Sequence, residues 1–419
     1  MELKKTFNNW FVWGLLSIAI VALYGTLMRY KIAFSFPFFD QKFLQHAHSH
    51  FAFSGWISHL LYCRLFMIVS QHINPNRYRM YKGLINANLL AAFGMLIAFT
   101  AEGYKATSIT FSTLTIVIAI VFCVRFFKDA KPIPRPFPAI KWAKYGLLLN
   151  ILSALGPFTL AYIMISKNTN TDFYLSSIYY YLHFQYNGWF FFGTMAVAIS
   201  LLPQHILSFD KYFKVFAVTA IPTYILSTLW AKPPLWLYII TIIATLAQLF
   251  AWIHLLVCFF KKRKSEVLKT DKLSGFLFYC AALALSIKFL LQAISVIPSL
   301  SQLVFGFRPI VIAYLHLVLL GVFSLFLIAD LMHSKLIIIN KITKATVIAF
   351  FIGVLFNEAL LGIQGVAAFT YTLIPFINEA LFVAACVLLL SSGGLLLSQF
   401  IQHKKLKSTI PYIRAEHQH

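Results

Sequence analysis

Long apolar stretches separated by short polar segments run through the whole chain. A transmembrane helix needs about 20 predominantly apolar residues, and twelve stretches come close to or exceed this length. They lie near residues 10–28, 46–70, 83–101, 107–127, 143–165, 177–202, 214–230, 235–260, 273–297, 309–332, 345–363 and 377–400. We therefore predict an all-α polytopic membrane protein with about twelve transmembrane helices. The seventh stretch is the shortest, and Pro222 interrupts it.

The polar segments alternate in charge along the chain. Lys and Arg gather in both tails and in every second connection, namely 64–82, 125–144, 211–214, 261–264 and 335–344, whereas the other connections carry few charges. By the positive-inside rule the basic set is cytoplasmic. We expect both termini on the cytoplasmic side of the cell (inner) membrane. The first apolar stretch follows Met1–Lys5 with no small-residue cleavage site, which indicates a retained signal-anchor.

Composition supports a bilayer environment and excludes other classes of partner. Of 419 residues, 60% are hydrophobic and 11% are charged, whereas soluble domains carry about 25% charged residues. The net charge of +23 arises from the loops just described, so nucleic-acid binding is not expected. The five cysteines lie in apolar stretches without paired spacing, so neither disulfides nor zinc sites are expected.

One short pattern occurs three times. Each copy has a His, four further residues, a Gly and then a large apolar residue, and the copies begin at His50, His183 and His316. The interval between successive histidines is 133 residues in both cases. The pattern falls in the second, sixth and tenth predicted spans. We therefore predict a single membrane domain built from three four-helix repeats, at approximately 1–140, 141–272 and 273–403, with a short cytoplasmic tail at 404–419.

The repeated histidines are candidates for a functional site. The three spans run in the same direction, which places the three imidazoles at a common depth of about 10 Å below the outer boundary. Ionisable groups inside a membrane are costly and tend to be functional, so the histidines are predicted to surround a shared site. The alternative is ordinary hydrogen bonding between helices. Two residues before each His stands another polar side chain: His48, Tyr181 and Tyr314.

The segment from His48 to Trp56 resembles the His-x-His-x-x-x-x-Gly motif of the haem-copper oxidase superfamily, especially its nitric oxide reductase and high-affinity oxidase branches. The resemblance covers the whole chain in architecture but only three short segments in motif. It implies a catalytic-subunit-like (subunit I) fold of twelve helices with pseudo-threefold symmetry. It also implies a low-spin haem b held by His316 together with His50 or its neighbour His46. The implied cofactor-binding set is His46, His48, His50, His183, Tyr314 and His316.

The sequence departs from that family at the positions that would hold copper and the second haem. The tenth span carries Tyr314 where the family has the high-spin haem ligand, and the stretch 214–230, where the family supplies two copper ligands, has no His. The last outer connection lacks the arginines that hold haem propionates. We therefore expect haem b without the usual copper centre, in electron transfer or in handling O2 or NO. An enzyme of this kind would be a respiratory-type oxidoreductase, with other membrane redox subunits or an electron donor as partners.

Four further ionisable residues lie in or beside the predicted spans. They are candidates for a proton path: Lys288, Glu102, Glu358 and Glu379. Together with the histidines they favour an alternative function, a proton-coupled secondary transporter. Transporters commonly consist of inverted halves, and a threefold parallel repeat fits that plan poorly. The glutamates can also be ordinary interfacial carboxylates.

Overall fold

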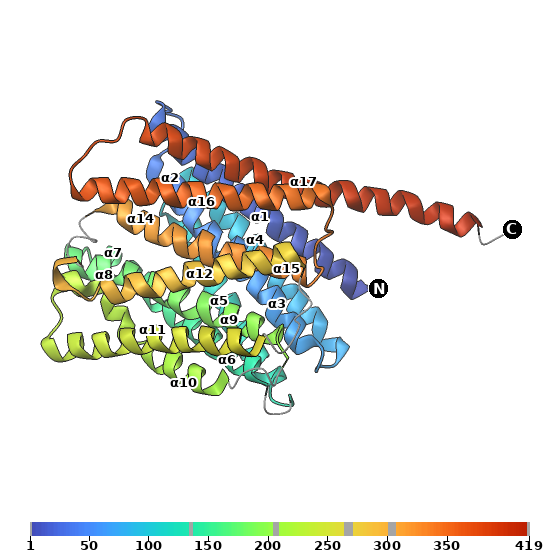
Figure 1. Cartoon of the computed structure of the whole chain (residues 1–419), viewed down its shortest axis with the longest axis horizontal. Helices are drawn as coiled ribbons and strands as arrows, with labels where there is room; N and C mark the ends of the chain where they lie inside the picture. The colour runs from blue at the N-terminus through green and yellow to red at the C-terminus, as the bar shows by residue number, and fades with distance from the viewer. Residues whose placement is uncertain (1, 134–136, 204–208, 264–270, 301–306, 417–419) are drawn as a thin grey trace.

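The computed structural model describes residues 2–133, 137–203, 209–263, 271–300 and 307–416, and within these ranges it contains helices and no strands (Figure 1). The first half of the chain forms α1 (Glu2–Ala33), α2 (Gln41–Phe51), η1 (Ala52–Ser58), α3 (His59–Ser70), η2 (Pro75–Arg77), α4 (Tyr78–Glu102), α5 (Ala106–Asp129), α6 (Pro138–Ser153), α7 (Leu155–Ile165), α8 (Thr171–His183), η3 (Phe184–Phe190) and α9 (Phe191–Ser200). The second half forms α10 (Phe209–Thr219), η4 (Pro222–Ala231), α11 (Leu235–Arg263), α12 (Lys272–Ile294), α14 (Arg308–His316), η5 (Leu317–Ser324), α15 (Leu325–His333), α16 (Lys341–Phe369) and α17 (Ile377–Glu416).

The described chain contains 11 helical segments that are long and apolar enough to cross a membrane. The prediction of an all-helical, multi-pass membrane protein is therefore confirmed. The predicted sixth span is helical over Thr171–Ser200 but is not among the eleven, because its Tyr, His, Gln and Asn side chains lower the hydropathy. At the predicted seventh span, Pro222 marks the change from α10 to the 3-10 helix η4, since proline lacks an amide hydrogen and disrupts an α-helix.

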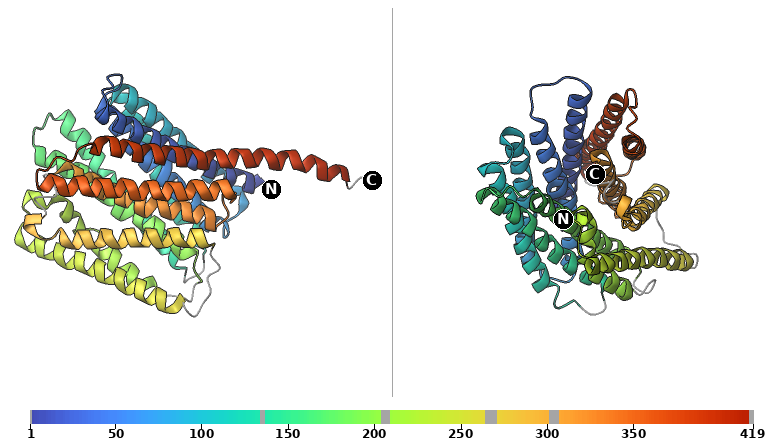
Figure 2. Two further views of the ribbon diagram at one scale, coloured as in Figure 1. Left: turned by 45° about the horizontal axis from the view of Figure 1, so that its top comes forward. Right: turned by 90° about the vertical axis from the view of Figure 1, so that its left-hand side faces the viewer.

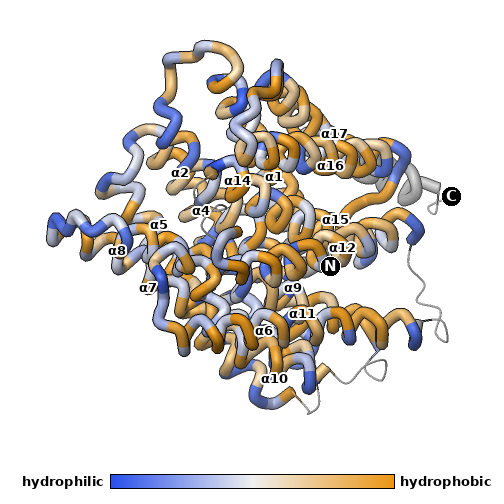
Figure 3. Tube along the Cα trace, turned by 60° about the vertical axis from the view of Figure 1, so that its left-hand side comes forward, coloured by the Kyte–Doolittle hydropathy of each residue, from blue (hydrophilic) through white to orange (hydrophobic). Residues whose placement is uncertain are grey.

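Large apolar side chains cover the outside of the bundle. Leu90, Ile243 and Leu390 are 72%, 62% and 74% exposed, and apolar residues run along the helices while hydrophilic ones gather at the helix ends and loops (Figure 3). A soluble protein rarely exposes so much contiguous apolar surface. The surface therefore suits a lipid bilayer.

The first and last helices of the chain pack against each other. α17 contacts both α1 and α16, and the hydroxyl of Thr26 donates to the carbonyl oxygen of Ala385 at 3.0 Å. Figure 2 shows α1 beside α17 in two views. Both termini lie at the same end of the bundle (Figure 1), so the chain crosses the bundle an even number of times.

Three π-helical segments follow the repeated histidines directly or after one residue. These are η1, η3 and η5, and each contains the Gly of the repeated pattern. They meet in the core, where the Trp56 indole N–H donates to Ser324 Oγ at 2.9 Å and the Trp189 indole N–H donates to Ser58 Oγ at 2.9 Å. π-Helical segments are rare and occur frequently at functional sites. The two indole–hydroxyl hydrogen bonds place the three pattern segments together in the core of the molecule.

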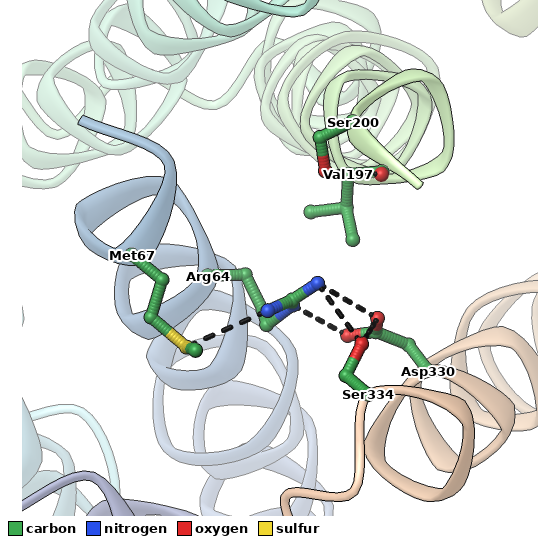
Figure 4. Close-up of polar contacts among 6 residues, drawn as sticks. All are labelled: Arg64, Met67, Val197, Ser200, Asp330 and Ser334. Carbon is green, nitrogen blue, oxygen red and sulfur yellow. Dashed lines mark hydrogen bonds and ion pairs between the residues drawn. The ribbon is translucent and has the colours of Figure 1, made fainter. Parts of the chain in front are cut away.

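A buried ion pair joins α3 to α15 nearer the end where the termini lie. Arg64 Nε is 2.7 Å from Asp330 Oδ2, and the two side chains are 7% and 1% exposed. The Ser334 hydroxyl also donates to Asp330 Oδ1 at 3.0 Å. In Figure 4, Val197 of α9 points toward this pair. Elements from three distant parts of the sequence therefore meet around these charges.

Candidate cofactor site between α1, α2 and α14

A cavity of about 530 Å³ lies between α1, α2, η1, α14, η5, α16 and α17. Its volume falls within the range of about 300–1,000 Å³ that is typical of cofactor and ligand sites. Most of its wall is aliphatic or aromatic, with Ile312, Leu319 and Phe350 as examples. His48 and His316 both line it, and the two imidazoles are close enough to interact electrostatically.

Within the described residues, the two histidines leave the same ring nitrogen without a hydrogen bond. His48 Nδ1 lies 3.0 Å from the carbonyl oxygen of Val21, and His316 Nδ1 lies 2.8 Å from the carbonyl oxygen of Ile312. A carbonyl can only accept, so each Nδ1 carries the proton and each Nε2 keeps its lone pair. No hydrogen bond from the described chain reaches either Nε2. Metal-ligating histidines are commonly oriented in this way, by a hydrogen bond from the other nitrogen to a carbonyl.

Other histidines within the helices use Nε2 for hydrogen bonds. His59 Nε2 lies 2.9 Å from the carbonyl oxygen of Trp10, and His50 Nε2 lies 2.8 Å from the Tyr104 hydroxyl. His183 has both nitrogens engaged, Nε2 with the carbonyl of Ala220 at 2.8 Å and Nδ1 with the Asn187 amide at 3.1 Å. These rings serve as hydrogen-bonding groups, so His48 and His316 differ from them in chemistry as well as in place.

The structure changes the histidine pairing expected from the sequence. His316 shares its cavity with His48 and not with His50 or His46. His50 stacks on Phe99 with ring centroids 4.5 Å apart, and His46 packs edge-on to Tyr104 at 4.6 Å. The physical reason is the rotation of α2 about its axis. His46 and His50 share one helix face, and that face turns toward α4, whereas the face of His48 turns toward α1 and α14.

The sequence predicts one shared site for His50, His183 and His316. In the structure each of the three lies in its own surroundings. His50 and Tyr181 line a second, smaller cavity of about 50 Å³. His183 is buried against Ala220 as described above. Tyr314 packs edge-on to Tyr186 at 6.1 Å and does not line the cavity of His316. The three repeated histidines therefore lie in different surroundings within the bundle.

Many polar side chains line the second cavity. Hydrogen bonds connect several of its lining groups: the Gln185 amide donates to Asn150 Oδ1 at 2.8 Å, and the Asn150 amide donates to Tyr62 at 2.9 Å. At its end, burial and the nearby Tyr174 raise the pKa of Tyr104 to about 12. Tyr104 therefore keeps its proton at neutral pH, and its hydroxyl can donate a hydrogen bond to His50 Nε2.

The four residues proposed for a proton path lie in unconnected surroundings. Lys288 is 3% exposed, and its ammonium nitrogen lies 4.1 Å from the centroid of the Phe289 ring. Glu102 accepts a hydrogen bond from the Ser108 amide at 3.1 Å, near the start of α5. Glu358 accepts from the Asn357 amide at 3.1 Å, and Glu379 lies in the first turn of α17. Within the described residues no hydrogen bond or ion pair links these four side chains.

Sequence reasoning did not identify two arginines that line the cavity of His48 and His316. Arg29 lies near the end of α1, and Arg308 is the first residue of α14. The sequence could have indicated them, because each is an arginine at the end of a predicted span with no acidic residue beside it.

In the ranges that the structure describes, no group of three or more His, Cys, Asp or Glu side chains could hold a metal ion by itself. A haem needs only the two axial ligands from the protein, because the porphyrin supplies the others. The cavity, the two free Nε2 atoms and the apolar wall therefore fit a haem.

Comparison of the sequence with models of known protein families and with curated proteins gives no match.

Proposed function

We propose that the protein binds one b-type haem, with His48 and His316 as axial ligands, and serves as an electron-transfer protein of the haem-copper oxidase subunit I type. One observation carries the proposal: two imidazoles from different helices line the same cavity, and neither Nε2 makes a hydrogen bond within the described residues. Neutral imidazole is a good ligand for haem iron. The apolar wall supports it further, since such surroundings exclude water.

Electron transfer suits this ligand set better than the handling of O2 or NO. When bound, a haem supplies a centre that gains and loses one electron. If His48 and His316 both held the haem iron, they would leave no open position for a diatomic ligand. The role of His48 and His316 is then to hold the haem and keep its orientation, and the partner would be another membrane redox protein or electron donor.

The proposed architecture has twelve spans in three four-helix repeats, with Thr171–Ser200 as the span beyond the eleven. Three observations support it. The termini lie at one end of the bundle, a π-helical segment accompanies each copy of the pattern, and the Arg64–Asp330 ion pair joins positions separated by 266 residues, twice the repeat interval. Val197 occupies the position midway between them in sequence. We place the termini in the cytoplasm because Lys and Arg are concentrated at that end.

The test is a reduced-minus-oxidised absorption spectrum of protein purified from haem-replete cells. We expect a b-type spectrum with low-spin features, abolished or converted to a high-spin form in His48→Ala and His316→Ala. His254→Ala is the matched control, because His254 bonds to Tyr212 at 2.8 Å outside the cavity, and its spectrum should be unchanged. A wild-type protein without a Soret band, or a spectrum indifferent to His316, would reject the haem and favour the transporter.

A further inference from the structure

Two arginines lie at one end of the cavity that contains His48 and His316. Arg29 is one turn before the end of α1, and Arg308 begins α14. Both helix ends are at the end of the bundle away from the termini (Figure 1). The cavity is therefore apolar along most of its wall and cationic at this end.

Among the described residues, Arg29 and Arg308 lack the acidic partners that three other arginines of the bundle have. Arg64 pairs with Asp330, while Arg77 and Arg125 both pair with Asp129. In the part of the chain that the structure describes, no carboxylate pairs with Arg29 or Arg308. The Arg308 guanidinium donates to Gln45 Oε1 at 2.7 Å, but a neutral amide does not compensate its charge.

Helix stability does not explain the position of Arg308, which is exposed, and full solvation does not explain the position of Arg29. A cation at a helix N-terminus, as at Arg308, is unfavourable to the helix dipole. Arg29 is half-buried and interacts electrostatically with both His48 and His316. A partly buried charge without a counter-ion costs free energy, so the site favours a ligand that brings negative charge to this end.

We propose that Arg29 and Arg308 bind the two propionate carboxylates of the haem, a role that rests on the proposed haem function. Both carboxylates of a b-type porphyrin lie on one edge of the ring. Arg308 and His316 are eight residues apart, which is about 12 Å along a helix, so the two ligating rings lie deeper than the arginines. A guanidinium matches a carboxylate with two parallel hydrogen bonds. These residues would take the place of arginines that the last outer connection lacks.

The experiment measures the binding of haem b and of its dimethyl ester to protein produced in haem-limited cells. The variants are Arg29→Gln, Arg308→Gln and the double variant. Arg79→Gln is the matched control, because Arg79 is exposed and does not line the cavity. Esterification should weaken binding to the wild type by about tenfold or more for each carboxylate–arginine contact. In the double variant the acid and the ester should bind equally, and the control should behave as the wild type does.

A second readout separates a local charge effect from misfolding. Arg29→Lys and Arg308→Lys keep the cation and should retain part of the preference for the acid. In the glutamine variants the midpoint potential of the bound haem should fall, because loss of a nearby cation stabilises the oxidised form. An ester penalty that persists in the double variant would overturn the arginine assignment and leave the haem proposal standing. Failure of the wild type to bind either compound would overturn both.

Discussion

At the scale of single residues, the Arg64–Asp330 pair shows how the core accommodates charge. Both side chains are almost completely buried, and Ser334 adds a hydrogen bond to the carboxylate. A pair of this kind is weak evidence for stability, because the cost of removing two ions from water offsets their attraction. Removing only one member of the pair should lower the stability strongly, because it leaves a buried charge without a counter-ion.

We predict that Asp330→Ala lowers the free energy of unfolding by about 3–5 kcal/mol. The double variant Arg64→Met/Asp330→Leu should lose less than Asp330→Ala alone, because it leaves no unpaired charge. Denaturation of the detergent-solubilised protein measures both. The matched control is Asp210→Ala, which breaks the exposed Lys141–Asp210 pair and should cost at most about 1 kcal/mol. A double variant less stable than Asp330→Ala would contradict this account.

At the scale of helices, the sequence predicts which segments are helical better than it predicts which way they face. Apolar length alone locates the eleven candidate membrane helices of the described chain, and Pro222 marks the break in the predicted seventh span. Apolar length does not show whether His48 or the pair His46 and His50 shares a cavity with His316, because His48 lies on the face of α2 opposite to the other two. Which face meets His316 depends on the rotation of α2, and that is set by packing against α1, α4 and α14.

The sequence also does not predict the π-helical segments, because their residue types are those of ordinary membrane helices. Their packing leads to a prediction about the indole–hydroxyl bonds between them. Trp189→Phe should destabilise the protein by about 1–3 kcal/mol, because it leaves the buried Ser58 hydroxyl without the indole donor. Adding Ser58→Ala should cause little further loss, which a double-mutant cycle measures as coupling.

The control for this cycle is Trp236→Phe, since Trp236 is 63% exposed on the apolar surface and should change the stability little. If the Trp189→Phe and Ser58→Ala effects were simply additive, the hydrogen bond would not couple η3 to η1.

At the scale of the whole molecule, the positions of the loops can be tested chemically. We predict that Asn168→Cys, in the connection between α7 and α8, reacts with a membrane-impermeant maleimide added to intact cells. Asn76→Cys, in the connection between α3 and α4, should react only after the cells are permeabilised, because it lies at the end of the basic loops. The five native cysteines lie within helices, and the unmodified protein gives the background. Labelling of Asn76→Cys in intact cells would invert the proposed orientation.

The two cavity histidines are held by main-chain oxygens, Val21 for His48 and Ile312 for His316. A carboxylate in the same place could take up or release a proton as the charge of the site changed, but a peptide carbonyl does not titrate. A redox centre with these ligands would exchange electrons without moving protons through its axial rings. The two hydrogen bonds thus favour a centre that relays electrons and leaves the coupling of proton transfer to other parts of the membrane.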